Sequence, residues 1–384
     1  MQFGSIALLT ALAAFVAMTM RHPLFLPLPA PLPGASSSAV SAVPSPWSVR
    51  SERGTTGLVR VIEGFEAPYG LAVLDDGTLF VMDALRGQAV RFSRSLSPLG
   101  VLDATADPSE FLHSIARAAD GTFLLSEHRK GWVRRYADDG TVLGYFFANP
   151  EDSTLAFVGP VHVFVDNARN IWITDYRAHR VFKFDERGTF LGWIGATTEG
   201  GLTNGFARSG LSQESASVGG FNSPHMTTVD RAGNFYVIDT ANHRVQKFSP
   251  EGMVLGWIGA RGDGTVTDGW EPVGISASTT VPGGFQRPTS VTLAEGTSAD
   301  DVLIVADTQN NRIQKFHATT GRFLGWMGKK LDGTVTHGWE REGNAVAGSE
   351  VGAFESPFGA QIVDGNLYVA DRGNKRVQII PMAR

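Results

Sequence analysis

The feature that most constrains this chain is a segment that recurs six times. Clear copies begin at Val158, Phe221, Phe285 and Phe354, and two more divergent copies precede them. An acidic residue closes the second strand-like run of every copy. These acids are Asp83, Glu127, Asp175, Asp239, Asp307 and Asp371. Because one such unit cannot bury its apolar face alone, six in a row predict a single repeat architecture in which neighbouring units pack together.

Each copy contains four short strand-like runs separated by turn residues. In the copy that begins at Phe221 they read MTTVD, FYVID, RVQKF and VLGWIG. Four strands per unit are typical of one propeller blade. The sequence therefore predicts an all-β, six-bladed β-propeller over residues 58–384, with the recurrent Phe and Trp side chains packed between blades.

The two ends of the repeat region indicate how the ring closes. The sixth copy stops at Ile380, directly after its third run, and so lacks a fourth strand. The missing run is found at the start, where residues 57–65 read GLVRVIEGF and match the segment that closes the other copies. We expect this N-terminal strand to complete the last blade, which leaves no long exposed sheet edge.

The segment before the propeller has the composition of a targeting region. Residues 1–20 include an uncharged apolar run that is short for a membrane span and suits a signal peptide. Residues 21–57 are rich in Pro, Ala and Ser and predict an extended linker. We therefore expect a secreted or extracytoplasmic protein. An uncleaved signal anchor, which would tether the chain to a membrane, and a misassigned start codon are the alternatives.

Composition excludes several classes of function. The formal net charge is −5 and the sequence pI is about 6.0, so the chain lacks the basic surface that nucleic-acid binding requires. It contains no cysteine, which excludes disulfides, thiolate catalysis and cysteine-ligated zinc. We expect a monomer whose partner is a peptide, a protein or a glycan.

The repeat resembles a known family. Its pattern, PxGxxVDxxGNxYVxDxxNxRVxKF, recurs from Pro68 to Ile380 and is similar to the NHL repeat. The resemblance implies a propeller. It does not imply a reaction, because propellers of this type serve as protein-binding, RNA-binding and enzymatic platforms.

Three connections between blades are unusually long. They span residues 196–220, 260–284 and 329–353, and they contain the similar segments EGGLTNGF, GDGTVTDGW and LDGTVTHGW. Loops of this length are usually either functional or disordered, and we expect these three to gather a partner over one mouth of the channel. The alternative is a rim hairpin that was duplicated together with its blade.

A turn motif, Asp-x-x-Asn-x-Arg, recurs between the second and third runs. Its arginines are Arg180, Arg244, Arg312 and Arg376, each five residues after the strand-ending acid. This spacing suits an ion pair across the turn, and we interpret the motif as scaffolding.

Three histidines lie near the start of the first strand of their blades. They are His113, His162 and His225, and the fold places them at the channel mouth on the face of the long connections. Neutral imidazoles that converge there would bind zinc or another divalent ion. The alternative is a set of polar channel residues that hold no ligand.

These histidines also resemble those of peptidyl-α-hydroxyglycine α-amidating lyase, whose zinc-binding histidines follow the repeat proline in alternate blades. His113 and His225 match two of those positions, and Phe358 occupies the third, so that His162 would have to substitute. Tyr176 lies within one residue of the family's catalytic tyrosine. The catalytic arginine expected in blade four is replaced by Thr240, while Arg372 holds the equivalent place in blade six. The resemblance implies catalytic roles for Tyr176 and Arg372.

The sequence thus supports two hypotheses of different classes. The leading one is an extracytoplasmic recognition scaffold that binds its partner through the long connections. The rival is a metal-dependent lyase centred on the three histidines.

Overall fold

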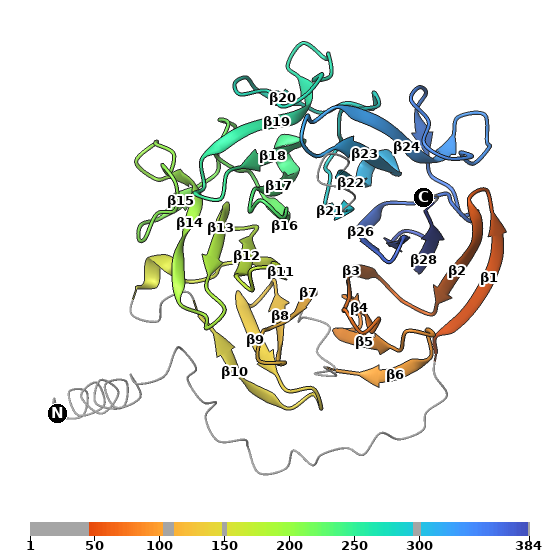
Figure 1. The fold of residues 1–384 in the computed structure, drawn as a ribbon, viewed down its shortest axis with the longest axis horizontal. Coiled ribbons are helices and arrows are strands. Elements are labelled where there is room, and N and C mark those ends of the chain that lie inside the picture. The colour runs from red at the N-terminus through yellow and green to blue at the C-terminus, as the bar shows by residue number, and fades with distance from the viewer. Residues whose placement is uncertain (1–45, 103–110, 148–151, 295–300, 383–384) are drawn as a thin grey trace, which may run out of the picture.

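A computed structural model of the chain describes residues 46–102, 111–147, 152–294 and 301–382. These residues form six small antiparallel sheets arranged in a ring, which confirms the predicted six-bladed propeller (Figure 1). The predicted signal segment, residues 1–20, and the linker up to residue 45 lie outside the described residues. Within the described ranges, no helix is both long and apolar enough to span a membrane.

The first three blades follow one another along the chain, and the strands of each blade are ordered from the channel outward. Blade 1 contains β3 (Pro68–Val73), β4 (Leu79–Asp83), β5 (Gln88–Phe92) and β6 (Pro98–Val101). Blade 2 contains β7 (Leu112–Arg117), β8 (Phe123–Glu127), β9 (Trp132–Tyr136) and β10 (Val142–Phe146). Blade 3 contains β11 (Pro160–Val165), β12 (Ile171–Asp175), β13 (Arg180–Phe184), β14 (Phe190–Thr197) and β15 (Ser212–Gln213), and the turn η1 (Ser153–Leu155) precedes it.

The next two blades repeat the pattern of blade 3, and the sixth uses both ends of the chain. Blade 4 contains β16 (Pro224–Val229), β17 (Phe235–Asp239), η2 (Thr240–Asn242), β18 (Arg244–Phe248), β19 (Val254–Arg261) and β20 (Ser276–Ala277). Blade 5 contains β21 (Ser290–Ala294), β22 (Val302–Asp307), η3 (Thr308–Asn310), β23 (Arg312–His317), β24 (Phe323–Lys330) and β25 (Ala345–Val346). Blade 6 contains β26 (Pro357–Val363), β27 (Asn366–Asp371), β28 (Arg376–Pro381), β2 (Gly57–Glu63) and β1 (Ser48–Gly54).

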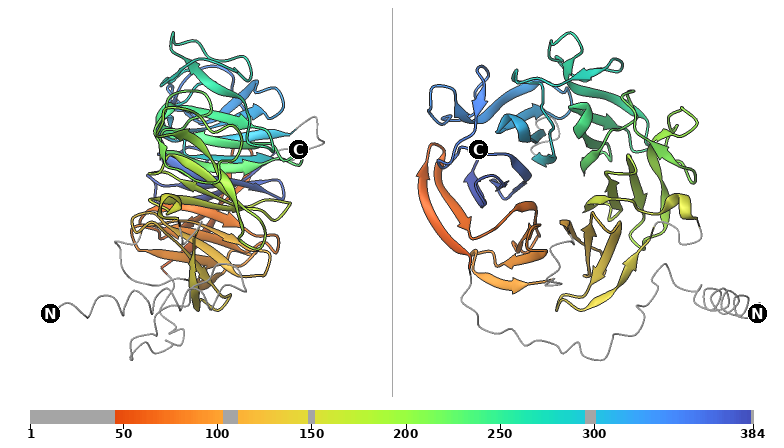
Figure 2. Two further views of the ribbon diagram at one scale, coloured as in Figure 1. Left: turned by 90° about the vertical axis from the view of Figure 1, so that its left-hand side faces the viewer. Right: turned by 180° about the vertical axis from the view of Figure 1, so that it is seen from behind.

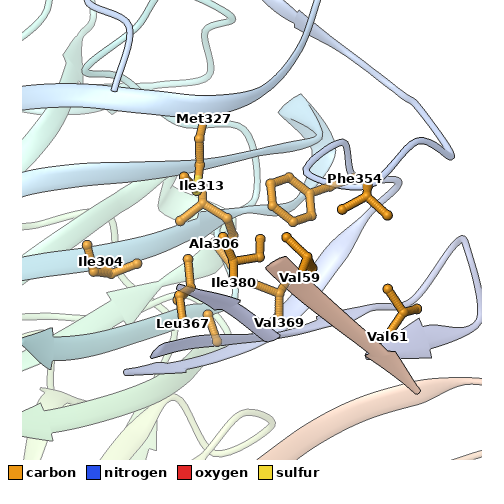
Figure 3. Close-up of a cluster of buried hydrophobic side chains, with 12 residues drawn as sticks. Val59, Val61, Ile304, Ala306, Ile313, Met327, Phe354, Leu367, Val369 and Ile380 are labelled. Atoms are coloured by element: carbon orange, nitrogen blue, oxygen red, sulfur yellow. The ribbon is translucent and has the colours of Figure 1, made fainter. Parts of the chain in front are cut away.

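The ring closes as the sequence predicted. β2 pairs antiparallel with β28, with Glu63 opposite Arg376 and Arg60 opposite Ile379. Val59 and Val61 on β2 are buried in the cluster that joins blades 5 and 6 (Figure 3). The N-terminal strand β2 and the last strand β28 are thus held together by backbone hydrogen bonds and by a shared apolar core.

The long connections do not reach over the channel, contrary to the prediction. Each folds back against the outermost strand of its own blade, where β15, β20 and β25 pair with β14, β19 and β24. They project from the outer rim of the disc (Figures 1 and 2). The physical reason is that the fourth strand would otherwise present a row of unpaired backbone groups, and a hairpin from the same connection pairs with that edge.

The Asp-x-x-Asn-x-Arg turns are scaffolding in blades 4, 5 and 6. In blade 5, Oδ2 of Asp307 accepts from Nε of Arg312 at 2.8 Å and from Nε2 of Gln314 at 3.0 Å. The guanidinium of Arg312 also donates to three carbonyls at the end of the long connection, and both charged side chains are fully buried. Blade 3 differs, because Arg180 instead donates to the carbonyls of Thr154 and Ala156.

Candidate functional site

One mouth of the channel is built from two sets of equivalent residues. The inner ring consists of the residue that follows the repeat proline, or Leu112 in blade 2. Its members are Tyr69, His113, Val161, His225, Thr289 and Phe358. The outer ring consists of the residue that follows the strand-ending acid. Its members are Ala84, His128, Tyr176, Thr240, Thr308 and Arg372. Each ring receives one residue from every blade, so the repeat itself sets the positions of these side chains.

A backbone irregularity directs the inner ring toward the axis. In blades 1, 2, 3, 4 and 6 the first strand slips its register directly after its first residue, as between Leu112 and Ser114 in blade 2. The residue in the slip is left out of the ladder. A bulge of this kind re-aims a side chain and is common at the rims of closed sheets and beside functional sites.

Two histidines and an aromatic ring form the buried floor of this mouth. The rings of His113 and His225 lie 5.5 Å apart between centroids, and Phe358 lies 4.9 Å from His225. His113 is 5% exposed and His225 is 4% exposed, so the pair is almost closed off from solvent. Nδ1 of His225 is buried and has no hydrogen-bond partner among the described residues. A buried nitrogen without a partner is costly and marks a place where a ligand can supply the missing contact.

The structure adds a histidine that the sequence analysis missed. His128 in the outer ring lies 5.3 Å from His113 and 5.6 Å from Tyr176 between ring centroids. The signal was present in the repeat, because His128 follows Glu127 just as Tyr176 follows Asp175. The divergence of the blade 2 copy hid this equivalence.

His162 does not join this cluster. Its Nδ1 accepts from the backbone N–H of Thr227 at 3.3 Å, and its ring stacks on Phe164. It lies one position further along its strand than the inner-ring residue Val161, so its equivalent in blade 2 is Ser114 and not His113. The side chain faces a cavity of about 730 Å³ that opens at the opposite end of the channel. Of the three histidines predicted to converge, the structure brings His113 and His225 together and places His162 apart.

The two residues assigned catalytic roles by resemblance both border the floor. Tyr176 lies 6.1 Å from His225 between ring centroids, and its hydroxyl accepts from Nη2 of Arg287 at 3.4 Å. Arg372 donates from Nη1 to the hydroxyl of Tyr69 at 2.9 Å, and its guanidinium lies 5.7 Å from the ring of Phe358. The opening therefore carries two phenols and two guanidinium groups, which are potential donors to an anionic ligand.

The histidines of the mouth are held neutral. Burial lowers the pKa of His225 to about 3, with a further contribution from nearby histidines and Arg287. Burial likewise lowers the pKa of His128 to about 4, and it places the pKa of His113 well below its ordinary value. Neutral imidazoles keep a lone pair, which is the form that ligates metal or accepts a hydrogen bond.

The fit to a metal ion is partial. The donor set is suitable, because neutral imidazole nitrogens ligate zinc and Nδ1 of His225 has no hydrogen-bond partner among the described residues. In the part of the chain that the structure describes, however, no three His, Cys, Asp or Glu side chains are grouped closely enough to hold an ion. Phe358 occupies the inner-ring position where a third histidine would face His113 and His225.

Comparison with known proteins agrees with the repeat and the fold. A family model described as the NHL repeat matches residues 221–248, which form the first three strands of blade 4. In structure, the chain is similar to a putative phosphatase from Bacteroides thetaiotaomicron. The TM-score is 0.56, the sequence identity is 13%, and the match covers 84% of this chain and 72% of the other. At this identity, the similarity shows the fold alone.

Two curated relatives are amidating enzymes. Over 172 residues, the chain is 33% identical to peptidyl-glycine alpha-amidating monooxygenase B of Xenopus laevis, which covers 44% of this chain and 16% of that protein. Over 170 residues, it is 31% identical to peptidyl-alpha-hydroxyglycine alpha-amidating lyase 1 of Drosophila melanogaster, which covers 44% of this chain and 27% of that protein. The chain is thus an NHL-repeat propeller with distant similarity to amidating enzymes, and it spans only a minor part of the length of either relative.

Proposed function

We propose that this NHL-repeat propeller is an extracytoplasmic recognition scaffold that binds a carboxylate-bearing ligand, such as the C-terminus of a peptide, at the channel mouth. The observation that carries the proposal concerns Arg287 and Arg372. Both are partly buried beside the floor, and each donates to a phenol rather than forming an ion pair with an acidic side chain of the described residues. A partly buried guanidinium with no carboxylate beside it is a site for an external one.

The surroundings of the two arginines favour a peptide over a compact inorganic anion. Tyr69 lies 4.9 Å from Phe111 and 4.3 Å from Phe358, so aromatic rings line the opening. Rings of this kind provide flat apolar surface for a carbon chain, and the neutral histidines accept hydrogen bonds from its amide groups. The amidating lyase that the chain resembles is named for a substrate of this class, since a peptidyl-alpha-hydroxyglycine ends in a carboxylate.

The proposal is tested with pairs of fluorescent peptides that differ only at the C-terminus, one ending in a carboxylate and the other in an amide. We expect the acid form to bind at least about tenfold more tightly in fluorescence polarisation. Arg372→Ala and Arg287→Ala should remove most of this preference. Arg94→Ala is the matched control, because Arg94 is exposed and pairs with Asp364 outside the mouth. Equal binding of both peptide forms would contradict the proposal.

The location is tested separately. Residues 1–20 have the composition of a signal peptide, so we expect the exported protein to begin beyond them. Mass spectrometry of the N-terminus after expression in a secreting host decides this. A mature chain that retains Met1 and the apolar run would support the signal anchor instead.

A metal-dependent lyase is the second candidate. It is favoured by the similarity to amidating enzymes and by the unpartnered Nδ1 of His225. His113 and His225 would hold the ion, with His128 as the nearest further imidazole. A bound zinc ion would act as a Lewis acid at the oxygen of a substrate. In this candidate Arg372 and Arg287 orient the substrate carboxylate, and the hydroxyl of Tyr176 exchanges a proton with the substrate.

This candidate is distinguished from the scaffold by turnover. The protein is reconstituted with zinc, dialysed, and incubated with a peptidyl-α-hydroxyglycine. Cleavage of the C–N bond would release a peptide amide and glyoxylate in equal amounts. A zinc content near one per chain together with both products would support the lyase, whereas binding of the peptide acid without either product would support the scaffold.

A further inference from the structure

A cavity lies between blades 2 and 3, on the face opposite the histidine cluster. Its volume is about 440 Å³, and its walls include Leu124, Arg135, Phe146, Ile171 and Gly188. The floor is apolar and is contributed by both blades, since Leu124, Phe146 and Ile171 belong to the cluster that joins them. The cavity is therefore a gap in the packing of one blade against the next.

The three following interfaces show what fills this gap elsewhere in the ring. Each long connection inserts one aromatic side chain, which we call the plug. The plugs are Phe206 between blades 3 and 4, Trp270 between blades 4 and 5, and Trp339 between blades 5 and 6. Each plug lies beside a lysine of the third strand, with the Nζ of Lys183, Lys247 and Lys315 at 5.1, 5.5 and 5.4 Å from the ring centroid.

The contacts of one plug define its seat. The ring of Phe206 lies 6.0 Å from Trp172 on its own blade and 6.0 Å from Phe235 on the next blade, between centroids. Lys183 covers the ring, and the residue before the plug, Gly205, abuts Gly252 in a turn of the next blade.

The repeat register shows that the residues lining the cavity are equivalent to the residues that surround Phe206 one blade later. Leu124 pairs with Arg135 across strands as Trp172 pairs with Lys183. In the cavity, Leu124 therefore takes the place of Trp172, and Arg135 takes the place of the cation Lys183. Ile171 and Gly188 stand where Phe235 and Gly252 stand one blade later. All four parts of the plug seat thus have a counterpart in the cavity.

Among the described residues, the plug itself has no counterpart there. The connection from β10 to β11 spans residues 147–159, and none of its described residues lines the cavity. Of these, the aromatic Phe157 packs against Phe182 and Phe184 of blade 3, and the aromatic Phe147 lies beside Tyr145 of its own blade. In the described part of the chain, the seat between blades 2 and 3 therefore has its floor and its cation but receives no aromatic side chain from the connection.

We propose that this cavity is a binding site for the aromatic ring of an external ligand, an indole or phenyl group that occupies the place taken by Phe206, Trp270 and Trp339 in the following interfaces. Arg135, held by an ion pair with Asp120 and a hydrogen bond to Thr122, supplies the cation against the ring. Arg169, Arg187 and Glu186 at the opening can contact polar groups attached to the ring. The site is independent of the channel mouth and of the function proposed for it.

The ring can belong to a free small molecule or to a side chain of a peptide, and two probes distinguish these sources. The first is a fluorinated indole, observed by fluorine NMR. The second is a peptide that copies residues 263–274, DGTVTDGWEPVG, with the indole fluorinated at the position of Trp270. We expect both signals to broaden on addition of the full-length protein. Tighter binding of the peptide identifies a protein partner, and equal affinity identifies a small aromatic molecule.

Two variants test whether the cavity is the site. Leu124→Trp introduces the residue found at the equivalent position of blade 3 and reduces the volume, and Arg135→Leu removes the cation but keeps an apolar wall. Each should weaken probe binding at least about fivefold. Arg94→Ala serves as the control, and retained ligand binding at the channel mouth or an unchanged Tm shows that a variant is folded. The proposal is overturned if neither probe binds, or if both variants bind as the wild type does.

Discussion

The guanidinium of Arg372 donates to the hydroxyl of Tyr69 at 2.9 Å although 303 positions separate the two residues in the chain. Arg372 follows the strand-ending acid of blade 6, and Tyr69 follows the repeat proline of blade 1. Their contact exists because closing the ring places the last blade beside the first. The floor of the channel mouth is therefore a product of closure, and its residues come from blades at both ends of the repeat region.

Introducing a third inner-ring histidine should create a metal site. We expect Phe358→His to bind zinc at least about tenfold more tightly than the wild type, because Phe358 already contacts the rings of both His113 and His225. Metal analysis after dialysis measures the change. Phe358→Asn, which is polar but has no imidazole, should bind as the wild type does. Equal zinc content in all three proteins would show that His113 and His225 cannot act as a pair of ligands.

The buried His225 should make the fold less stable in acid. Its pKa is about 3 in the folded protein, whereas an unfolded chain takes up the proton near 6.5. Between these values the unfolded state binds more protons, so this histidine reduces the free energy of unfolding as pH falls from 6.5 toward 3. His225→Gln should remove up to roughly 1.4 kcal/mol per pH unit of that dependence. Urea titrations at several pH values measure the slope.

The exposed Leu58 provides the control for this experiment. Leu58→Gln makes the same kind of polar substitution at a position with no titratable side chain, so it should leave the slope unchanged. A slope that is the same in the His225 variant and the wild type would contradict the assigned burial.

The closing strand should contribute strongly to stability. Ile62 on β2 is fully buried, and Ile62→Ala should lower the free energy of unfolding by about 2–5 kcal/mol through lost contacts and a residual cavity. Leu58 lies on the same strand but is 60% exposed, so Leu58→Ala should change stability by less than about 0.5 kcal/mol. Denaturant unfolding compares the two. Similar effects of both changes would mean that β2 does not pack as described.

The turn scaffold should depend on its buried ion pairs and not on its surface pairs. Arg312→Leu leaves the carboxylate of Asp307 buried without its cation and should cost about 3–5 kcal/mol. Lys375→Ala breaks the exposed pair with Glu66 and should cost less than about 1 kcal/mol. Thermal and urea unfolding provide the measurement. If Arg312→Leu were tolerated as well as Lys375→Ala, the motif would not be scaffolding.

The long connections show where sequence reasoning failed and why. Their length and their mutual similarity were visible, and their face of the disc followed from the order of strands. The direction in which they project could not be predicted from the sequence. It depends on the pairing of Ala196 with Gln213 and of Ala260 with Ala277, and these contacts are made by very short strands that have little sequence pattern of their own. The unpaired edge of the fourth strand determined the outcome, and that edge exists only once the blade has formed.

The sequence alone determined the number of blades, the order of their strands and the strand that closes the ring. These are set by a periodic pattern of apolar residues, turns and acids that each unit repeats, and such a pattern has one compact solution. Only the tertiary structure decided which side chains meet at the channel. His128 joins His113 and His225 because it follows the strand-ending acid of the blade that carries His113, whereas His162 lies one position further along its strand than the inner ring and so faces the opposite end. The empty aromatic seat beside Arg135 was likewise visible only when the blades were packed together, since a missing plug is a property of an interface and not of a segment.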